Sequence, residues 1–90
     1  MTAAIDAIKE TIEKVKGVRG LAAGLPDNAD IINGVGLDSL EMLRFMLEIE
    51  ERLSIQIDFD MLEYSYFNSI RTLAEVLETM PSRQPPASVS

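Results

Sequence analysis

The chain has 90 residues, a formal net charge of −7 and 47% hydrophobic residues, which suits one small domain with its own core. It contains no cysteine and no histidine, which excludes disulfides, thiolate metal sites and the commonest general base of enzymes. Its uncharged stretches are far shorter than the roughly 20 residues of a membrane span, and its N-terminus lacks a signal or transit pattern, so we expect a cytoplasmic protein.

The negative charge is concentrated in the middle of the chain. Residues 38–63 contain eight acidic side chains and only two basic ones, Arg44 and Arg52, and so carry −6 of the total. Such a segment repels nucleic acid and anionic membranes and favours basic protein surfaces. We therefore expect neither nucleic acid nor a membrane as a partner, although a merely solubilising surface explains the charge equally well.

The N-terminal residues predict an amphipathic helix of roughly four turns. Its apolar residues recur at helical spacing, with charged residues between them: Ile5, Ile8, Ile12 and Val15. Gly17 follows as the expected C-cap. Residues 17–37 contain all five glycines of the chain and predict a long loop. Several apolar side chains in this loop are candidates to pin it to the core: Leu21, Leu25, Ile31, Ile32 and Leu37.

A second amphipathic helix is predicted from Asp38 to about residue 53. Asp38 is the expected N-cap, and Glu41 stands three positions later, which is the spacing of a capping box. The apolar stripe of this helix consists of Leu40, Leu43, Met46, Leu47, Ile49 and Leu53. Because these residues cover a wide arc, we expect one side of the helix to face the core and part of the rest to be available to a partner.

The stretch IQIDFD, residues 55–60, alternates like a β-strand. No second strand-like run exists to pair with it, so we interpret it as an extended linker. Asp60 and Glu63 repeat the capping-box spacing and predict a short helix to about Tyr64. Ser69 is a candidate cap for a last helix, whose apolar face consists of Ile70, Leu73, Leu77 and Met80.

These elements predict an all-α fold, a small four-helix bundle with three main helices, one short helix and a long first loop. We expect the domain to span residues 1–80. Residues 81–90 contain too few apolar side chains to fold and predict a disordered tail. The residues expected to meet inside the bundle are Ile12, Leu43, Leu47, Phe67 and Leu73.

The residues argue against several kinds of site. The acidic stretches lack the alternating ligands and the glycine of a calcium-binding loop, so no metal site is expected. Gly34 and Gly36 precede a helix, but no strand precedes them and Ser39 replaces the third glycine of a dinucleotide-binding loop. Ser39 also lacks the flanking glycines and the histidine partner of a hydrolase nucleophile.

Ser39 therefore remains either a helix cap or an attachment point. If Asp38 is the cap, Ser39 is the first helical residue and its hydroxyl is not needed for capping. It would then lie at the positive end of the helix, where a covalently attached phosphate is favoured. Such a serine needs no internal base if another enzyme performs the chemistry.

Three segments together resemble the acyl and peptidyl carrier proteins over about residues 4–80: GLDSLEML, the acidic helix RFMLEIEERLSIQI and the late FNSIRTLAEVLE. The resemblance implies an acyl-carrier-protein-like bundle with 4′-phosphopantetheine joined to Ser39 by a phosphodiester. A phosphopantetheinyl transferase would install this group from coenzyme A. The chain would then be a stand-alone, monomeric carrier without catalytic activity, holding an acyl or aminoacyl group as a thioester.

The resemblance also implies that partner enzymes dock on the helix from Ser39 to Leu53. These are the transferase, a loading ligase or synthase, and downstream transferases. The positions that match the recognition surface of the family are Asp38, Leu40, Glu41, Leu47, Glu50 and Glu51. On this basis the acidic residues are expected to steer basic partners towards Ser39.

Arg44 departs from the family pattern, because carriers of fatty acid synthesis usually have an acid at this position. A basic residue there would weaken docking to a basic groove and favours a specialised carrier. The main alternative is a helical adaptor domain for protein interaction, in which Ser39 is only structural. A small enzyme is disfavoured, because carboxylates are the only candidate general bases.

Overall fold

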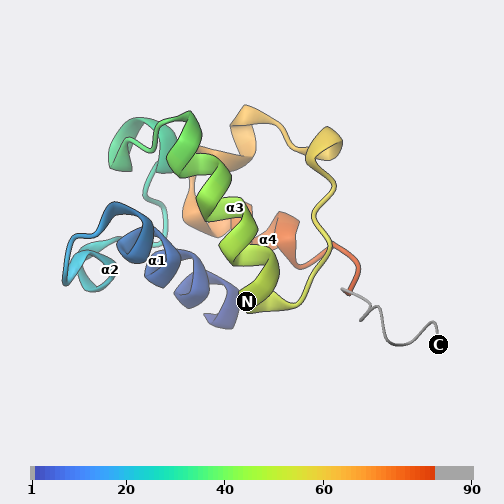
Figure 1. The fold of residues 1–90 in the computed structure, drawn as a ribbon, viewed down its shortest axis with the longest axis horizontal. Coiled ribbons are helices and arrows are strands. Elements are labelled where there is room, and N and C mark those ends of the chain that lie inside the picture. Colours follow the sequence, from blue (N-terminus) through green and yellow to red (C-terminus); the bar gives the residue numbers. More distant parts are fainter. Residues whose placement is uncertain (1, 83–90) are drawn as a thin grey trace.

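Three α-helices form the framework of the computed structural model, which describes residues 2–82: α1 (Thr2–Lys16), α3 (Ser39–Leu53) and α4 (Ile70–Leu77) (Figure 1). Short helical segments lie in the connections: α2 (Leu21–Gly24), the π-helical turn η1 (Ile31–Val35), and the 3-10 turns η2 (Phe59–Met61) and η3 (Tyr64–Asn68). The predicted all-α fold with three main helices is confirmed. The described residues contain no β-strand, so the rejection of a strand at residues 55–60 is confirmed. The predicted extended linker is too long, because η2 begins at Phe59.

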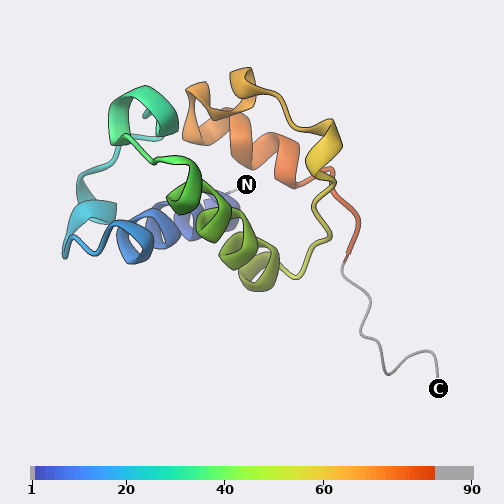
Figure 2. The ribbon, with the colours of Figure 1, turned by 45° about the horizontal axis from the view of Figure 1, so that its top comes forward.

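The helix α1 organises the bundle, because it contacts α2, α3 and α4. Both ribbon views show α1 and α3 side by side, with the connection from residue 54 to residue 69 looping away from them (Figures 1 and 2). The helix α1 ends as predicted before Gly17. Gly17 has a φ of +69° and donates its backbone N–H to the carbonyl of Glu13 at 2.9 Å. This left-handed conformation favours glycine.

Apolar side chains from the three main helices, the first loop and the connection between α3 and α4 form the core. Its largest fully buried members are Ile8, Ile12, Ile31, Phe45, Ile49, Ile70, Leu73 and Leu77. Of the predicted core residues, Ile12, Phe67 and Leu73 are buried. The assignment of Leu43 and Leu47 to the core was wrong, since each is 51% exposed.

The inward face of α3 explains this error. Phe45, Met46 and Ile49 point into the core, and a helix can present only part of its circumference to its neighbours. Leu43 and Leu47 lie outside that arc, although they are just as apolar. The sequence stripe was centred on the leucines and did not include Phe45, the largest of the fully buried side chains.

The first loop is pinned to the core as predicted and is partly helical. Ile31 and Leu37 are buried, while Leu21, Leu25 and Ile32 pack against the core. Asp30 begins the turn η1, because its Oδ1 accepts from the backbone N–H groups of Ile32 at 3.0 Å and Asn33 at 2.7 Å. The segment just before η1 is therefore held in place, and its backbone carbonyls can accept hydrogen bonds from α4.

The predicted cap of α4 was wrong. Ser69 occupies the N-cap position, but its side chain makes no capping hydrogen bond. Two carbonyls of the first loop take that role, since Ala29 accepts from the N–H of Ile70 at 3.0 Å and Asp27 accepts from the N–H of Arg71 at 2.8 Å. The start of α4 is thus satisfied by a tertiary contact instead of a local one.

The predicted capping box of Asp60 and Glu63 was also wrong. Asp58 caps η2 instead, with its Oδ1 accepting from the N–H of Asp60 at 3.0 Å. Leu62 has an extended backbone that separates η2 from η3, so no continuous helix connects the two residues of the predicted box. A second turn begins at Tyr64, where the predicted helix was expected to end.

Two residues of the predicted tail contact the linker after α3. The carbonyl of Pro81 accepts from the N–H of Gln56 at 2.9 Å, and Ser82 forms an isolated antiparallel bridge with Ile55. The rest of that tail, residues 83–90, lies outside the described residues. The division into a domain of residues 1–80 and a disordered tail therefore stays a prediction.

Asp27 connects α1, the first loop and α4, and gives stability a pH dependence. Its Oδ1 accepts from Lys9 Nζ at 2.6 Å, and its Oδ2 accepts from Arg71 Nη2 at 3.0 Å. The hydrogen bond from Lys9, together with the positive charges of Lys9 and Arg71, holds the pKa of Asp27 below its ordinary value of 3.8. A lowered pKa stabilises the fold above the unfolded-state pKa, and this contribution is lost as the pH falls through the folded-state pKa.

We therefore expect Asp27→Asn to lower the thermal unfolding midpoint at pH 7 and to lose this effect in acid. The measurement is thermal unfolding of variant and wild type in a pH series from 7 down to below the ordinary pKa of an aspartate. Glu75→Gln on the exposed side of α4 is the control and should follow the wild type throughout. A deficit of Asp27→Asn that stays constant into strong acid would assign it to the amide substitution and not to the ionised carboxylate.

Candidate functional site

Ser39 is the first residue of α3, and its side chain is exposed. Asp38 before it is the N-cap, since its Oδ1 accepts from the N–H of Glu41 at 2.8 Å. Glu41 Oε1 in turn accepts from the N–H of Asp38 at 3.1 Å, so both halves of the predicted capping box are present. The hydroxyl of Ser39 is therefore not needed to cap the helix.

The loop before Ser39 is fixed by a glycine and a lysine. Gly36 has a φ of +80° and donates its N–H to the carbonyl of Ile31 at 3.2 Å, which ends η1 and turns the chain towards α3. Lys16 at the end of α1 reaches the same place, where its Nζ lies 3.5 Å from the carbonyl oxygen of Gly36 and 3.3 Å from Glu41 Oε1. These contacts attach the start of α3 to α1.

The chemistry available at Ser39 is that of an acceptor. The first turn of α3 carries the partial positive charge of a helix N-terminus, which favours an anionic group attached there. The sequence offers no histidine or cysteine as a base or nucleophile beside it. Among residues 2–82, no three side chains of the metal-ligating types gather at one place.

A shallow groove of about 330 Å³ begins at Ser39. Its walls come from α3 and from the segment that contains η2 and η3, and consist of Met42, Leu43, Met46, Phe59, Leu62, Glu63, Tyr64 and Phe67. Glu63 is the one charged side chain among them, so the groove is mainly apolar. An extended chain attached to Ser39 would have an apolar surface to lie against.

A larger groove, of about 960 Å³, lies between residues 56–61 and the C-terminal end of α4. Phe59 borders both grooves, but Ser39 does not line the larger one. The smaller groove is therefore the one that belongs to the candidate site.

The predicted recognition residues at and after Asp38 differ in exposure and contacts. Asp38 is exposed, while Glu41 and Glu50 are partly buried. Leu40 and Glu51 are exposed, as is Leu47. Glu41 is held in the capping box, and Glu50 Oε2 accepts from the N–H of Ile57 at 2.8 Å. Leu43 is exposed too and was not among the predicted recognition residues, although its position between Leu40 and Leu47 at helical spacing was a signal for it.

Comparison with protein families gives the family of the chain. A family model described as "Phosphopantetheine attachment site" matches residues 6–77, which include the whole of α3 and α4. A search of curated proteins finds no match to the chain. No helix among residues 2–82 combines the length and the apolar character needed to cross a lipid bilayer.

Proposed function

We propose, since the chain belongs to the phosphopantetheine attachment site family and this family binds 4′-phosphopantetheine covalently, that Ser39 is the residue that holds the group. The observation that carries the proposal is the exposed Ser39 hydroxyl at the first position of α3, with capping performed by Asp38. The bound group supplies a thiol, on which an acyl or aminoacyl group is held as a thioester. This chain, which has no cysteine, has no thiol of its own.

The surroundings of Ser39 suit such a group. A phosphodiester on the hydroxyl would place its negative charge beside the N–H groups of the first turn of α3, where the helix dipole stabilises it. The groove of about 330 Å³ gives the pantetheine chain an apolar wall formed by Met42 and Leu43 on one side and Tyr64 on the other.

The proposed role of the protein is that of a stand-alone carrier without catalytic activity. A phosphopantetheinyl transferase would modify Ser39, a ligase or synthase would load the cargo, and downstream transferases would accept it. These partners would dock on α3, which begins at Ser39. The cytoplasmic location expected from the sequence stays a prediction, as does the monomeric state.

The test is the intact mass of the protein after incubation with coenzyme A and a broad-specificity phosphopantetheinyl transferase. We expect a mass gain that matches one phosphopantetheine group, and fragmentation of the modified protein should place it on the peptide that contains Ser39. The control reaction omits coenzyme A. A chain that stays unmodified, or that is modified at another serine, would favour the alternative of a helical adaptor domain in which Ser39 is structural.

A further inference from the structure

Two carboxylates stand at the position where the phosphodiester would be attached. Asp38 precedes Ser39, and its Oδ1 accepts from the N–H of Glu41 at 2.8 Å. Glu41 closes the capping box, because its Oε1 accepts from the N–H of Asp38 at 3.1 Å. A hydrogen bond to a neutral N–H group leaves the charge of a carboxylate in place. A phosphodiester on Ser39 would therefore add a third negative charge to two neighbouring ones, and like charges repel one another.

Lys16, the last residue of α1, brings a positive charge to the same place. Its Nζ lies 3.3 Å from Glu41 Oε1 and 3.5 Å from the carbonyl oxygen of Gly36. The side chains of Lys16 and Glu41 are only 26% and 24% exposed. A partly buried pair is screened by salt much less than an exposed one. Because Glu41 Oε1 also bonds to the N–H of Asp38, the ammonium group is two contacts away from the residue before Ser39.

Lys16 is the base that serves the start of α3. Among residues 2–82, no second lysine or arginine forms a hydrogen bond or an ion pair with residues 36–41. Arg44 is the first base along α3, but it comes five positions after Ser39, whereas side chains that meet on a helix are three or four positions apart. Arg52 lies at the other end of the helix. The charge at the start of α3 is therefore offset from α1.

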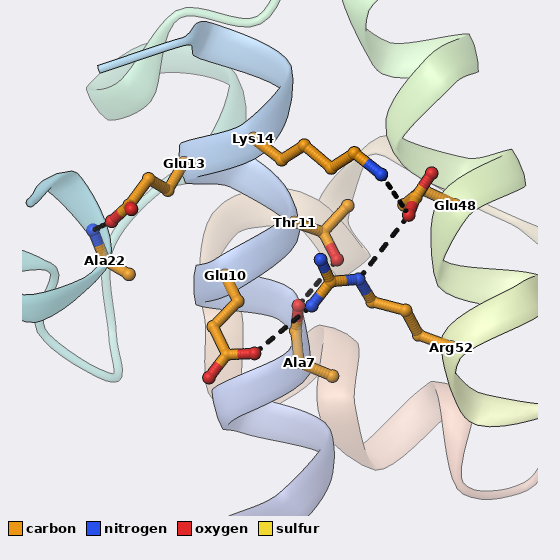
Figure 3. A network of polar contacts seen from close by, with 8 residues as sticks. All are labelled: Ala7, Glu10, Thr11, Glu13, Lys14, Ala22, Glu48 and Arg52. Carbon is orange, nitrogen blue, oxygen red and sulfur yellow. Dashed lines mark hydrogen bonds and ion pairs between the residues drawn. The ribbon is translucent and has the colours of Figure 1, made fainter. Parts of the chain in front are cut away.

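Lys14 offers a comparison within the same pair of helices. It stands two residues before Lys16 and also contacts an acid of α3, since its Nζ lies 2.9 Å from Glu48 Oε2. Figure 3 shows Lys14 and Arg52 converging on Glu48. This contact lies about two and a half turns of α3 beyond Ser39. Both lysines thus bridge α1 and α3, but only Lys16 does so beside the candidate site.

We propose that Lys16 is part of the attachment site: its ammonium group compensates the charge of Glu41 and so lets the fold accept a phosphodiester on Ser39. This inference rests on the proposed function and adds a residue of α1 to the site. The helix dipole alone supplies only about half an elementary charge at the start of α3, which is less than the charge of one carboxylate. Without Lys16, the attached group would bring three full negative charges together with no base beside them.

The experiment compares the thermal unfolding midpoints of the unmodified and the modified protein. The modified form is prepared with coenzyme A and a broad-specificity phosphopantetheinyl transferase, and intact mass shows that modification is complete. We expect modification to change the midpoint of the wild type by less than about 1 °C and to lower that of Lys16→Gln by about 3 °C, a shift that a fraction of an ion-pair energy produces in a domain of this size. A purely structural contribution of Lys16 is present in both forms and cancels in this difference.

Lys14→Gln is the matched control. It removes a bridge between the same two helices, so it should lower both midpoints equally and leave the effect of modification as in the wild type. Lys16→Arg keeps the charge and should also behave as the wild type. Adding Glu41→Gln to Lys16→Gln should remove the penalty of modification, because the glutamine oxygen can still accept from the N–H of Asp38 but carries no negative charge.

Salt provides a second readout. The penalty of modification in Lys16→Gln should nearly vanish in 1 M potassium chloride, where charges are screened beyond about 3 Å. A penalty that persists at high salt would mean that Lys16 acts through the packing of its side chain, and would overturn the proposal.

The outcomes separate this inference from the proposed function. If the wild type is not modified at Ser39, both fail. If it is modified and the penalty of Lys16→Gln equals that of Lys14→Gln, only this inference fails. Should Lys16→Gln be too unstable to measure, Glu41→Gln alone decides: it leaves Lys16 available to the phosphate, so modification should raise its midpoint relative to the effect in the wild type. An unchanged effect of modification in Glu41→Gln would overturn the role of Lys16.

Discussion

Replacing Ser39 with alanine should abolish the phosphopantetheine mass gain and leave the fold nearly as stable as wild type. The hydroxyl is the proposed acceptor, so no modification is possible without it. The stability should change by well under the roughly 1 kcal/mol that a helix cap contributes, because Asp38 performs the capping through the N–H of Glu41 at 2.8 Å. The measurements are intact mass after the transferase reaction and thermal unfolding of the same preparation.

Asp38→Ala is the matched control for that result. It removes the acceptor of the capping hydrogen bond and should cost about 1 kcal/mol of stability, while the Ser39 hydroxyl remains. The two variants should thus separate the two roles of neighbouring residues: one loses modification, the other loses stability. Equal destabilisation of both would mean that Ser39 contributes to the cap and that its hydroxyl is less available than the geometry indicates.

Truncation of the inward face of α3 should nearly unfold the protein. Phe45 and Ile49 are fully buried, and replacing either with alanine should cost about 2–5 kcal/mol through lost burial and the cavity that remains. Small domains have only about 5–15 kcal/mol of stability in total. Urea unfolding monitored by circular dichroism gives the free energy of unfolding for each variant.

Leu47→Ala on the same helix is the control for this prediction. Its side chain is half exposed, so its removal should cost roughly 1 kcal/mol or less. The opposite result, with Leu47→Ala severely destabilised and Phe45→Ala tolerated, would return the leucines to the core where the sequence pattern placed them. It would also mean that Leu43 and Leu47 do not belong to the exposed face of α3.

Local spacing made much of the fold predictable. The capping box of Asp38 and Glu41 and the C-cap at Gly17 depend on residues within one turn of each other, and both are present. The final helix was found from the stripe that includes Leu73 and Leu77, both buried. In each case the signal and the structure it specifies lie within a few residues of sequence.

The features that were missed depend on distant contacts. Ser69 has the right residue type for a cap, but carbonyls of the first loop reach the start of α4 instead. The orientation of α3 was misassigned because its apolar residues cover more arc than one neighbour can bury, and only packing decides between Phe45 and Leu47. No spacing rule in the sequence contains that information.

The candidate site also has a part that could be predicted from the sequence and a part that could not. The Asp-Ser order before a helix left Ser39 open as a cap or an attachment point, and its role as the attachment residue came from the resemblance to carrier proteins. Its partner surface was less predictable, because Glu48 and Glu50 look like exposed acids in the sequence. Their engagement with Lys14 and with the backbone of Ile57 arises only when α1 and the linker are in place.

The capping of α4 by the first loop has a consequence for the local unfolding of the chain and for its amide hydrogen exchange. Amide hydrogens in the first turn of a helix usually exchange quickly with solvent, but those of Ile70 and Arg71 are bonded to carbonyls of a segment far earlier in the sequence. Arg71 and Asp27 are 44 positions apart. The N-terminal turn of α4 is therefore completed only when that segment is docked, so its stability depends on a contact between distant parts of the chain. We expect the exchange rates of these two amides to report on the anchoring of residues 27–29.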